Sequence, residues 1–187
     1  MNFNFGFTSG GSASSSANLY GLFSETGSST PVTNTTVETT LIDGGLGTLT
    51  VPANGFTVGD GFRVDMLGHI SSQNNRTLRI RVKANSVVLG DTGAITMPQT
   101  TAKHWSLQIN FTLRAIGAAG VASIATAGMF TYSKDASNAF EGANFVTIEN
   151  TTFDTTISNT LNITAEWGFA TSLNSIYTDI LNLYKIY

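Results

Sequence analysis

The chain has 187 residues, a formal net charge of −3 and only 11% charged residues, whereas ordinary globular domains contain about 25%. The acidic balance argues against the broad basic surface that nucleic-acid binding requires. The absence of cysteine excludes a disulfide framework, a zinc–thiolate site and a thiol nucleophile. No apolar run reaches the roughly 18 residues of a membrane-spanning helix. We therefore expect neither a nucleic-acid partner nor a membrane partner.

The first 30 residues are expected to form an arm on a single domain covering residues 31–187. The stretch "TSGGSASSS" has the composition of a linker, and it follows "NFNFGF", in which Phe3, Phe5 and Phe7 alternate with polar residues. These rings could dock on a neighbouring subunit, as an added strand or in a pocket; the alternative is a leader without a docking role. The opening also lacks the basic start and apolar core of a secretory signal, so we expect a protein that is not secreted.

From about residue 33 onward, apolar and polar residues alternate with period two, and turn signals recur at short intervals. Strands are predicted at 36–42, 46–51, 62–70, within 74–93, and at 105–116, 121–132, 144–150, 160–170 and 175–187. Eight or nine strands with glycine-rich turns and no confident helix predict an all-β protein. An antiparallel jelly-roll β-sandwich is the most economical arrangement.

The strand at 105–116 has the clearest alternation in the chain. Five alternate residues are predicted to face the core, namely Trp105, Leu107, Ile109, Phe111 and Leu113. Trp167 is also expected in the core; the alternative, a sugar-stacking platform, would need exposed aromatic neighbours.

The last segment, 175–187, is apolar on both faces. It is therefore expected to lie centrally in a sheet or under a neighbouring chain, and Tyr184, Ile186 and Tyr187 are candidate assembly residues. A helix over 172–183 is the alternative, but it would leave these three residues without a role.

Arg79, Arg81 and Lys83 occupy alternate positions of one predicted strand. On a strand they share one face at a spacing of about 6–7 Å. Three interpretations are open: the solvated face of a half-buried strand, a row of intersubunit ion pairs, or a phosphate site. The stacking aromatics of a nucleic-acid-binding sheet are missing from this stretch, so the solvated face is favoured.

Motifs for catalysis or metal binding are not evident. His69 and His104 are the only histidines, and no Gly-x-Ser-x-Gly elbow accompanies them. The turns "DGG", "GDG" and "GDTG" do not repeat Asp or Asn at alternate positions as a calcium loop does. We therefore expect no catalytic residue, no cofactor and no metal.

Four stretches between residues 33 and 132 follow one another in a recognisable series: "TNTTVETTLI", "TLTVPANGFTVGDGFRVDMLGHISS", "TLRIRVKANSVVLGDTGAI" and "WSLQINFTLRAIGAAGVASIATAGMFTY". This series resembles a jelly-roll domain found in structural proteins of tailed bacteriophages and related viruses. Each motif alone is a loose sandwich pattern, and the ordered series carries the resemblance over a little more than half of the chain.

The resemblance implies a non-enzymatic virion component that is made in the host cytoplasm and commonly assembles as a homotrimer. Its partners would be copies of itself and the major capsid protein or other virion proteins. Family members often open with a longer shaft, so the short arm here favours a capsid decoration, cement or minor capsid protein. The alternative is a receptor- or glycan-binding module of a head or tail fibre. That alternative predicts a host surface glycan as partner and exposed aromatics such as Tyr132, Phe140 and Phe153.

Overall fold

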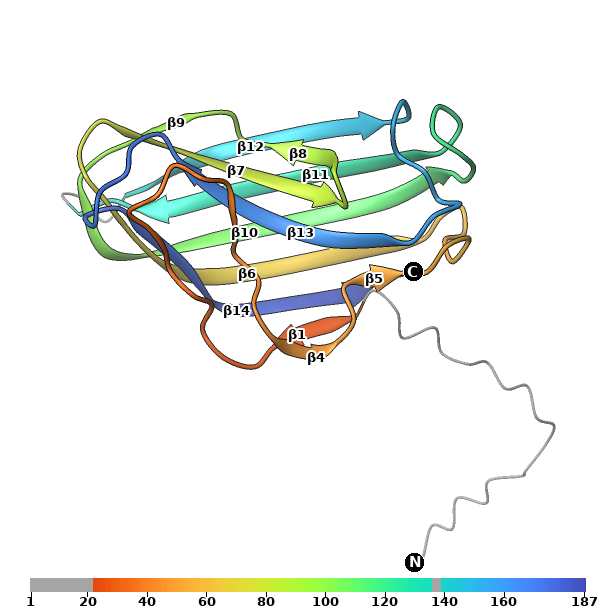
Figure 1. The fold of residues 1–187 in the computed structure, drawn as a ribbon, viewed down its shortest axis with the longest axis horizontal. Helices are drawn as coiled ribbons and strands as arrows, with labels where there is room; N and C mark the ends of the chain where they lie inside the picture. Colours follow the sequence, from red (N-terminus) through yellow and green to blue (C-terminus); the bar gives the residue numbers. More distant parts are fainter. Residues whose placement is uncertain (1–21, 136–138) are drawn as a thin grey trace, which may run out of the picture.

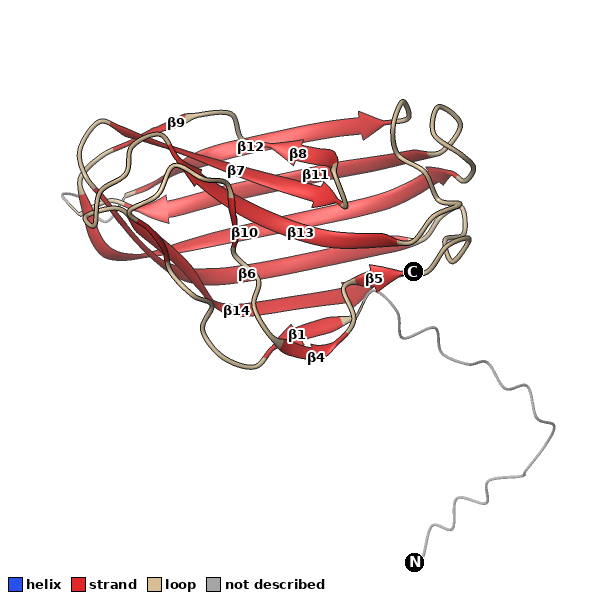
Figure 2. Ribbon diagram, viewed as in Figure 1, coloured by secondary structure: helices blue, strands red, loops and turns tan. Residues whose placement is uncertain are grey.

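The computed structural model describes residues 22–135 and 139–187, and its regular structure is entirely β-strand. Two antiparallel sheets lie in two layers and share one hydrophobic core (Figures 1 and 2). The all-β prediction is therefore confirmed.

The larger sheet contains, in spatial order, β12 (Phe140–Glu149), β11 (Ser123–Ser133), β10 (Thr100–Ala115), β6 (Gly61–Ser72), β14 (Ser175–Lys185), β1 (Phe23–Glu25) and β4 (Gly45–Gly47), with β2 (Val32–Thr33) beside β14. The smaller sheet contains β3 (Thr39–Thr40), β13 (Asn159–Trp167), β7 (Arg76–Ala84) and β8 (Val87–Asp91), with β5 (Thr50–Val51) beside β13 and β9 (Ile95–Met97) beside β7.

The predicted alternation on β10 is confirmed, because its inward side chains are buried in the shared core: Trp105, Leu107, Ile109, Phe111 and Leu113. Trp105 and Trp167 are both buried, as expected for core residues. Each indole N–H donates to a backbone carbonyl oxygen, that of Tyr177 for Trp105 and that of Val32 for Trp167, both at 3.0 Å. The two polar atoms are thus satisfied inside the core, which removes the cost of burying them.

The predicted strands at 36–42 and 46–51 are much shorter than expected. Only β3, β4 and β5 form there, because threonine hydroxyls compete with the sheet for backbone donors. Thr40 Oγ1 accepts the N–H of Ile42, and Thr48 Oγ1 accepts the N–H of Thr50, both at 3.0 Å. Each of these short turns ends a strand that the sequence pattern would otherwise continue.

The C-terminal segment is a strand, and the alternative of a helix over 172–183 is wrong. β14 lies between β6 and β1 in the larger sheet, which explains why the segment is apolar. Its register with β6 shifts between Thr178 and Ile180. This bulge inserts Asp179, so that Asp179 and Ile180 both lie on the outer side.

Part of the predicted arm belongs to the folded domain. β1 pairs with β14, and Phe23 and Ser29 are buried, so residues 22–30 pack on the sandwich. The candidate docking residues Phe3, Phe5 and Phe7 lie outside the described residues.

The β11–β12 hairpin extends the larger sheet beyond β10, and the ring of Phe145 is one of its contacts with the smaller sheet. Phe145 of β12 is buried and lies against two glycines, Gly128 of β11 and Gly90 of β8. A Cβ on Gly128 would lie 2.3 Å from the Cζ of Phe145, and one on Gly90 would lie 2.2 Å from its Cε2. Both positions must therefore be glycine for the ring to fit.

We predict that Gly128→Ala lowers the free energy of unfolding by about 1–3 kcal/mol, because the added methyl group overpacks the Phe145 ring. Urea unfolding followed by circular dichroism measures the change. Gly44→Ala is the matched control, since nothing lies within 4 Å of a Cβ at that position, and it should leave stability nearly unchanged. Equal effects from the two variants would contradict this account of the packing.

Candidate assembly surface

The outer face of the smaller sheet carries the basic row, and acidic residues of the same chain neutralise it. Arg79 Nε donates to both carboxylate oxygens of Asp91 at 2.8 and 3.0 Å. Glu38 accepts from Arg81 at 2.9 Å and from Lys83 at 3.1 Å, and Glu166 accepts from Arg81 as well.

The three cations and their three carboxylates thus form one intrachain network. This arrangement agrees with the favoured interpretation of a solvated strand face. The intersubunit ion pairs proposed for the basic row stay a prediction, and they would have to displace these intrachain partners.

The outer face of the larger sheet differs in character, because uncharged polar residues and exposed apolar ones dominate it. Leu67 of β6 and Ile180 of β14 are cross-strand neighbours, 44% and 50% exposed. Met129 of β11 and Leu46 of β4 are also exposed on this sheet. We call Leu67 and Ile180 the apolar patch. Met129 and Leu46 lie apart from it, at the two ends of a cross-strand row whose members between them are Gln108, Asp65, Asn182 and Ser24.

The charged groups in the middle of this face are paired with each other. Asp65 accepts from Arg63 Nε at 3.0 Å and from Gln108 Nε2 at 3.1 Å, and the hydroxyl of Tyr184 also donates to it. Tyr184, a predicted assembly residue, therefore lies on the same face as the apolar patch. Its hydroxyl is engaged within the chain, and its ring is half-buried.

The other two candidate residues of the C-terminus, Ile186 and Tyr187, are exposed at the end of the larger sheet. Their backbone is held in place, since the N–H of Ile186 donates to the carbonyl of Gly61 at 2.8 Å. The structure thus brings Tyr184, Ile186 and Tyr187 to one sheet, with two of their side chains open to contact.

The apolar patch is absent from the predictions made on the sequence. Leu67 could have been found, because it stands at an outward position between Asp65 and His69 in a period-two strand. Ile180 could not, because the bulge that turns it outward leaves no signature in the apolar pattern.

The two histidines meet on the larger sheet near the same bulge. The rings of His69 and His104 lie 4.6 Å apart, and His69 Nδ1 is 2.6 Å from Asp179 Oδ2. Ser28 Oγ donates to the other oxygen of Asp179 at 2.8 Å. Here the carboxylate stands between serine and histidine, whereas a nucleophilic triad needs the imidazole between them. The cluster is therefore not arranged to activate Ser28.

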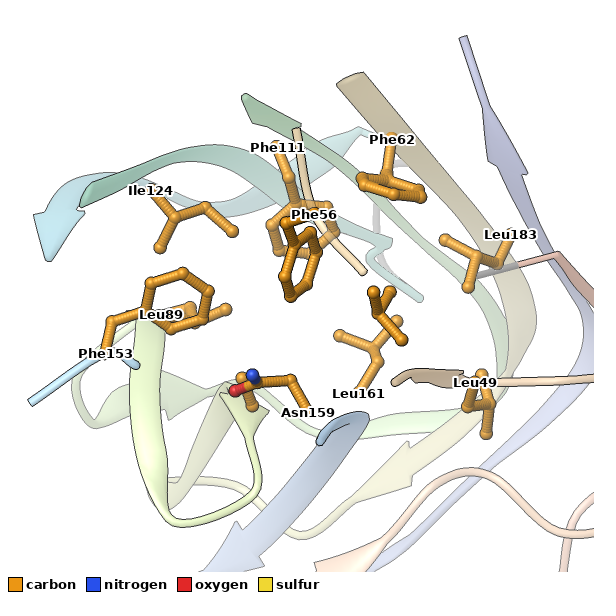
Figure 3. Close-up of a pocket in the computed structure, with 12 residues that line it drawn as sticks. Leu49, Phe56, Phe62, Leu89, Phe111, Ile124, Phe153, Asn159, Leu161 and Leu183 are labelled. Carbon is orange, nitrogen blue, oxygen red and sulfur yellow. The ribbon is translucent and has the colours of Figure 1, made fainter. Parts of the chain in front are cut away.

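An apolar cavity lies between the two sheets and is lined by residues of both, among them Leu183 of the larger sheet and Leu161 of the smaller one (Figure 3). Its room for water-sized molecules is about 50 Å³; a volume of about 430 Å³ is reached only when all empty space, including open solvent at the mouth, is counted. Figure 3 shows that phenylalanine and leucine side chains surround it, among them Phe56, Phe62, Phe111, Phe153 and Leu161. The amide of Asn159 also lines the cavity, but its Nδ2 donates to the carbonyl oxygens of Asp154 and Ile157 at 2.7 and 3.0 Å. The cavity thus offers apolar contact rather than acid–base chemistry.

No group of three or more His, Cys, Asp or Glu residues that could hold a metal ion occurs within 22–135 and 139–187. In the same ranges, no helix is long and apolar enough to cross a membrane.

Comparison with known protein families found no matching family model, and comparison with curated protein sequences found no significant match. The resemblance to virion proteins therefore depends on the sequence motifs alone.

The ion-pair network predicts a pH-dependent contribution to stability. Hydrogen bonds from the Arg79 guanidinium lower the pKa of Asp91 below its ordinary value of 3.8. A carboxylate with a lowered pKa stabilises the fold above the pKa of the unfolded chain, and it loses this effect as the pH falls through its folded pKa. We predict that Asp91→Asn lowers the free energy of unfolding by at most about 1 kcal/mol at neutral pH, because the pair is partly exposed.

The difference between the Asp91→Asn variant and the natural chain should shrink as the pH falls below 3.8, since the natural carboxyl is then protonated as well. Urea unfolding of both proteins across this range measures it. The asparagine can still accept the Gly93 N–H that Asp91 accepts at 2.8 Å, so the turn is preserved. A difference that grows in acid would contradict the assignment.

Proposed function

We propose that this chain is a non-enzymatic structural component of a virus particle, which assembles as a homotrimer and is anchored by its N-terminal arm. A capsid decoration, cement or minor capsid protein is the role that we favour. The observation that carries the proposal is the contrast between the two outer faces: the charges of one are neutralised within the chain, and the other is broad, weakly charged and dotted with exposed apolar side chains.

The strand order supports a jelly roll, as the sequence resemblance implies. Without the β11–β12 hairpin and the short strands β2, β4 and β9, the chain pairs its strands as a nested series. β1 lies beside β14, β3 and β5 lie beside β13, β6 lies beside β10, and β7 lies beside β8. In this series the first strand pairs with the last, the second with the second-last, and so on toward the middle of the chain. This is the strand pairing that results when one long hairpin is rolled into two sheets.

The composition of the larger sheet supports self-association. Exposed apolar residues on a sheet face lose water when a partner covers them, at about 25 cal/mol per Å² of apolar surface. Subunit cores are depleted of charged residues for the same reason. Leu67 and Ile180 lie side by side on the two central strands of this sheet, where the core of such an interface would lie.

The alternative, a receptor- or glycan-binding module, finds less support. Of the three aromatic residues that it predicts to be exposed, Tyr132 and Phe153 are buried, and only Phe140 is exposed. A carbohydrate platform needs several exposed rings close together, so this set cannot form one.

We predict that the full chain is a trimer in native mass spectrometry and that Ile180→Asp weakens the association at least about 100-fold, because a charge would be buried without a partner. Val88→Asp is the matched control, since Val88 is also exposed but belongs to the smaller sheet; it should leave the trimer intact. A monomeric natural chain, or equal loss of association in both variants, would contradict the assembly proposal.

The role on the particle needs its own measurement. We predict that quantitative mass spectrometry of purified virions detects the chain in a copy number divisible by three. Deletion of residues 1–21 should lower its occupancy on the particle while the trimer persists in solution. Unchanged occupancy would remove the arm as the anchor, and absence of the chain from particles would overturn the virion assignment.

A further inference from the structure

β12 is an open edge of the larger sheet. In the part of the chain that the structure describes, it pairs only with β11, and it ends the strand order (Figure 1). The register between the two strands runs without a shift from Ile124 opposite Glu149 to Ser133 opposite Phe140. One side of β12 therefore presents a straight row of backbone N–H and C=O groups that no described strand pairs.

This edge lacks most of the features that normally protect a sheet from pairing with another chain. Natural edges are short or bulged, or carry proline or charged side chains, lysine above all. β12 is 10 residues long, runs without a bulge against β11 and contains no lysine, arginine or proline; its charges are Glu141 and Glu149, near its two ends. Its outward side chains include Phe140, Val146 and Ile148, which are 75%, 78% and 53% exposed.

The other sheet ends differ from β12. β4 and β3 have 3 and 2 residues, and β8 has 5 residues with a register shift against β7. Among the described strands that end a sheet, β12 is thus the long and regular one.

We propose that β12 pairs antiparallel with β12 of a second copy, about a two-fold axis at Asn144. The sequence is self-complementary in this register. Phe140 then lies opposite Ile148 of the second copy, and an aromatic residue opposite a β-branched one is a favourable cross-strand pair. Gly142 lies opposite Val146, and the amide of Asn144 faces its own counterpart, where each can donate to the other.

Charge fixes this register against the adjacent one. With the axis at Asn144, Glu141 lies opposite Thr147. With the axis one residue further, at Phe145, Glu141 would lie directly opposite Glu149, and like charges in opposite positions are destabilising. With the axis one residue earlier, at Ala143, no like charges meet, but only residues 140–146 of β12 can pair, whereas the axis at Asn144 pairs residues 140–148. The register at Asn144 is therefore favoured, because it pairs more of the strand than the one at Ala143 and avoids the glutamate pair of the one at Phe145.

The contact does not depend on the proposed trimer. Leu67 and Ile180 lie on β6 and β14, which are separated from β12 by β10 and β11. A heterologous or cyclic contact through the apolar patch and a two-fold contact through β12 can coexist, in which case the edge would link one assembly to the next.

The natural chain contains no cysteine, so a single introduced cysteine reports the contact without background. We expect Asn144→Cys to form an interchain disulfide in most molecules under mild oxidation, because opposite Cβ atoms in an antiparallel pair lie about 4.5–5.5 Å apart. Met129→Cys is the control. Met129 pairs with Asn144 on the neighbouring strand, so two copies of it would lie three strand spacings apart, roughly 14 Å, and should not link.

The register is tested by mixing two further variants. Phe140→Cys and Ile148→Cys should each stay monomeric on non-reducing gels, and their mixture should give the heterodimer. Val146→Lys in the Asn144→Cys background should reduce disulfide formation at least tenfold while the circular dichroism of the sheet is unchanged. Asn144→Cys in the Ile180→Asp background should still link, which separates this contact from the trimer.

Failure of Asn144→Cys to link, or equal linking by Met129→Cys, would overturn the proposal. So would a disulfide that forms only between Asn144→Cys and a Phe5→Cys chain, because the occupant of the edge would then be the N-terminal arm of another copy.

Discussion

The burial of both sheets against each other is the constraint on which the rest of this molecule depends. Side chains alternate along a strand, so every residue committed to the shared core sends its neighbours outward. On β7, Leu78, Ile80 and Val82 are buried in the core, and the basic residues between them therefore lie on the outer face. The character of each outer surface is therefore decided by what remains after the core has been filled.

The outward-facing residues differ between the two sheets. The smaller sheet places opposite charges on adjacent strands, where they can pair. The larger sheet places serine, threonine, asparagine and aliphatic residues outward, with few charges among them. A partner of matching shape that covers a sheet of the second kind removes its exposed apolar side chains from water, which lowers the free energy. The assembly proposal and the edge contact are two expressions of this property.

Much of the fold could be predicted from the sequence, and the failures have physical causes. Period two located β6, β7, β10, β11, β13 and β14, because each strand has one face in the core. It overestimated the strands around Thr40 and Thr48, because a hydroxyl that satisfies a nearby N–H is invisible to a hydrophobic pattern. It also placed the end of the arm too late, since β1 contributes only three residues to the sheet and its pairing with β14 bridges most of the chain length.

The surface was harder to predict than the core. The acidic partners of the basic row come from three separate places in the chain, and only the sheet order brings Glu38, Asp91 and Glu166 to it. The cluster of His69 and Asp179 depends on a bulge that no pattern announces. The sequence alone therefore indicated which strand residues face away from the core. It could not indicate which of these side chains already have a hydrogen-bond or ion-pair partner within the chain.

The balance of positive and negative charges on the outer face of the smaller sheet affects its electrostatic field at long range. Arg79, Arg81 and Lys83 are matched by three carboxylates within a few ångströms, so the field of this face cancels beyond about one Debye length, roughly 8 Å in physiological salt. If the larger sheet is turned toward sister molecules, the face that meets the surrounding medium neither attracts nor repels a charged cell envelope from a distance.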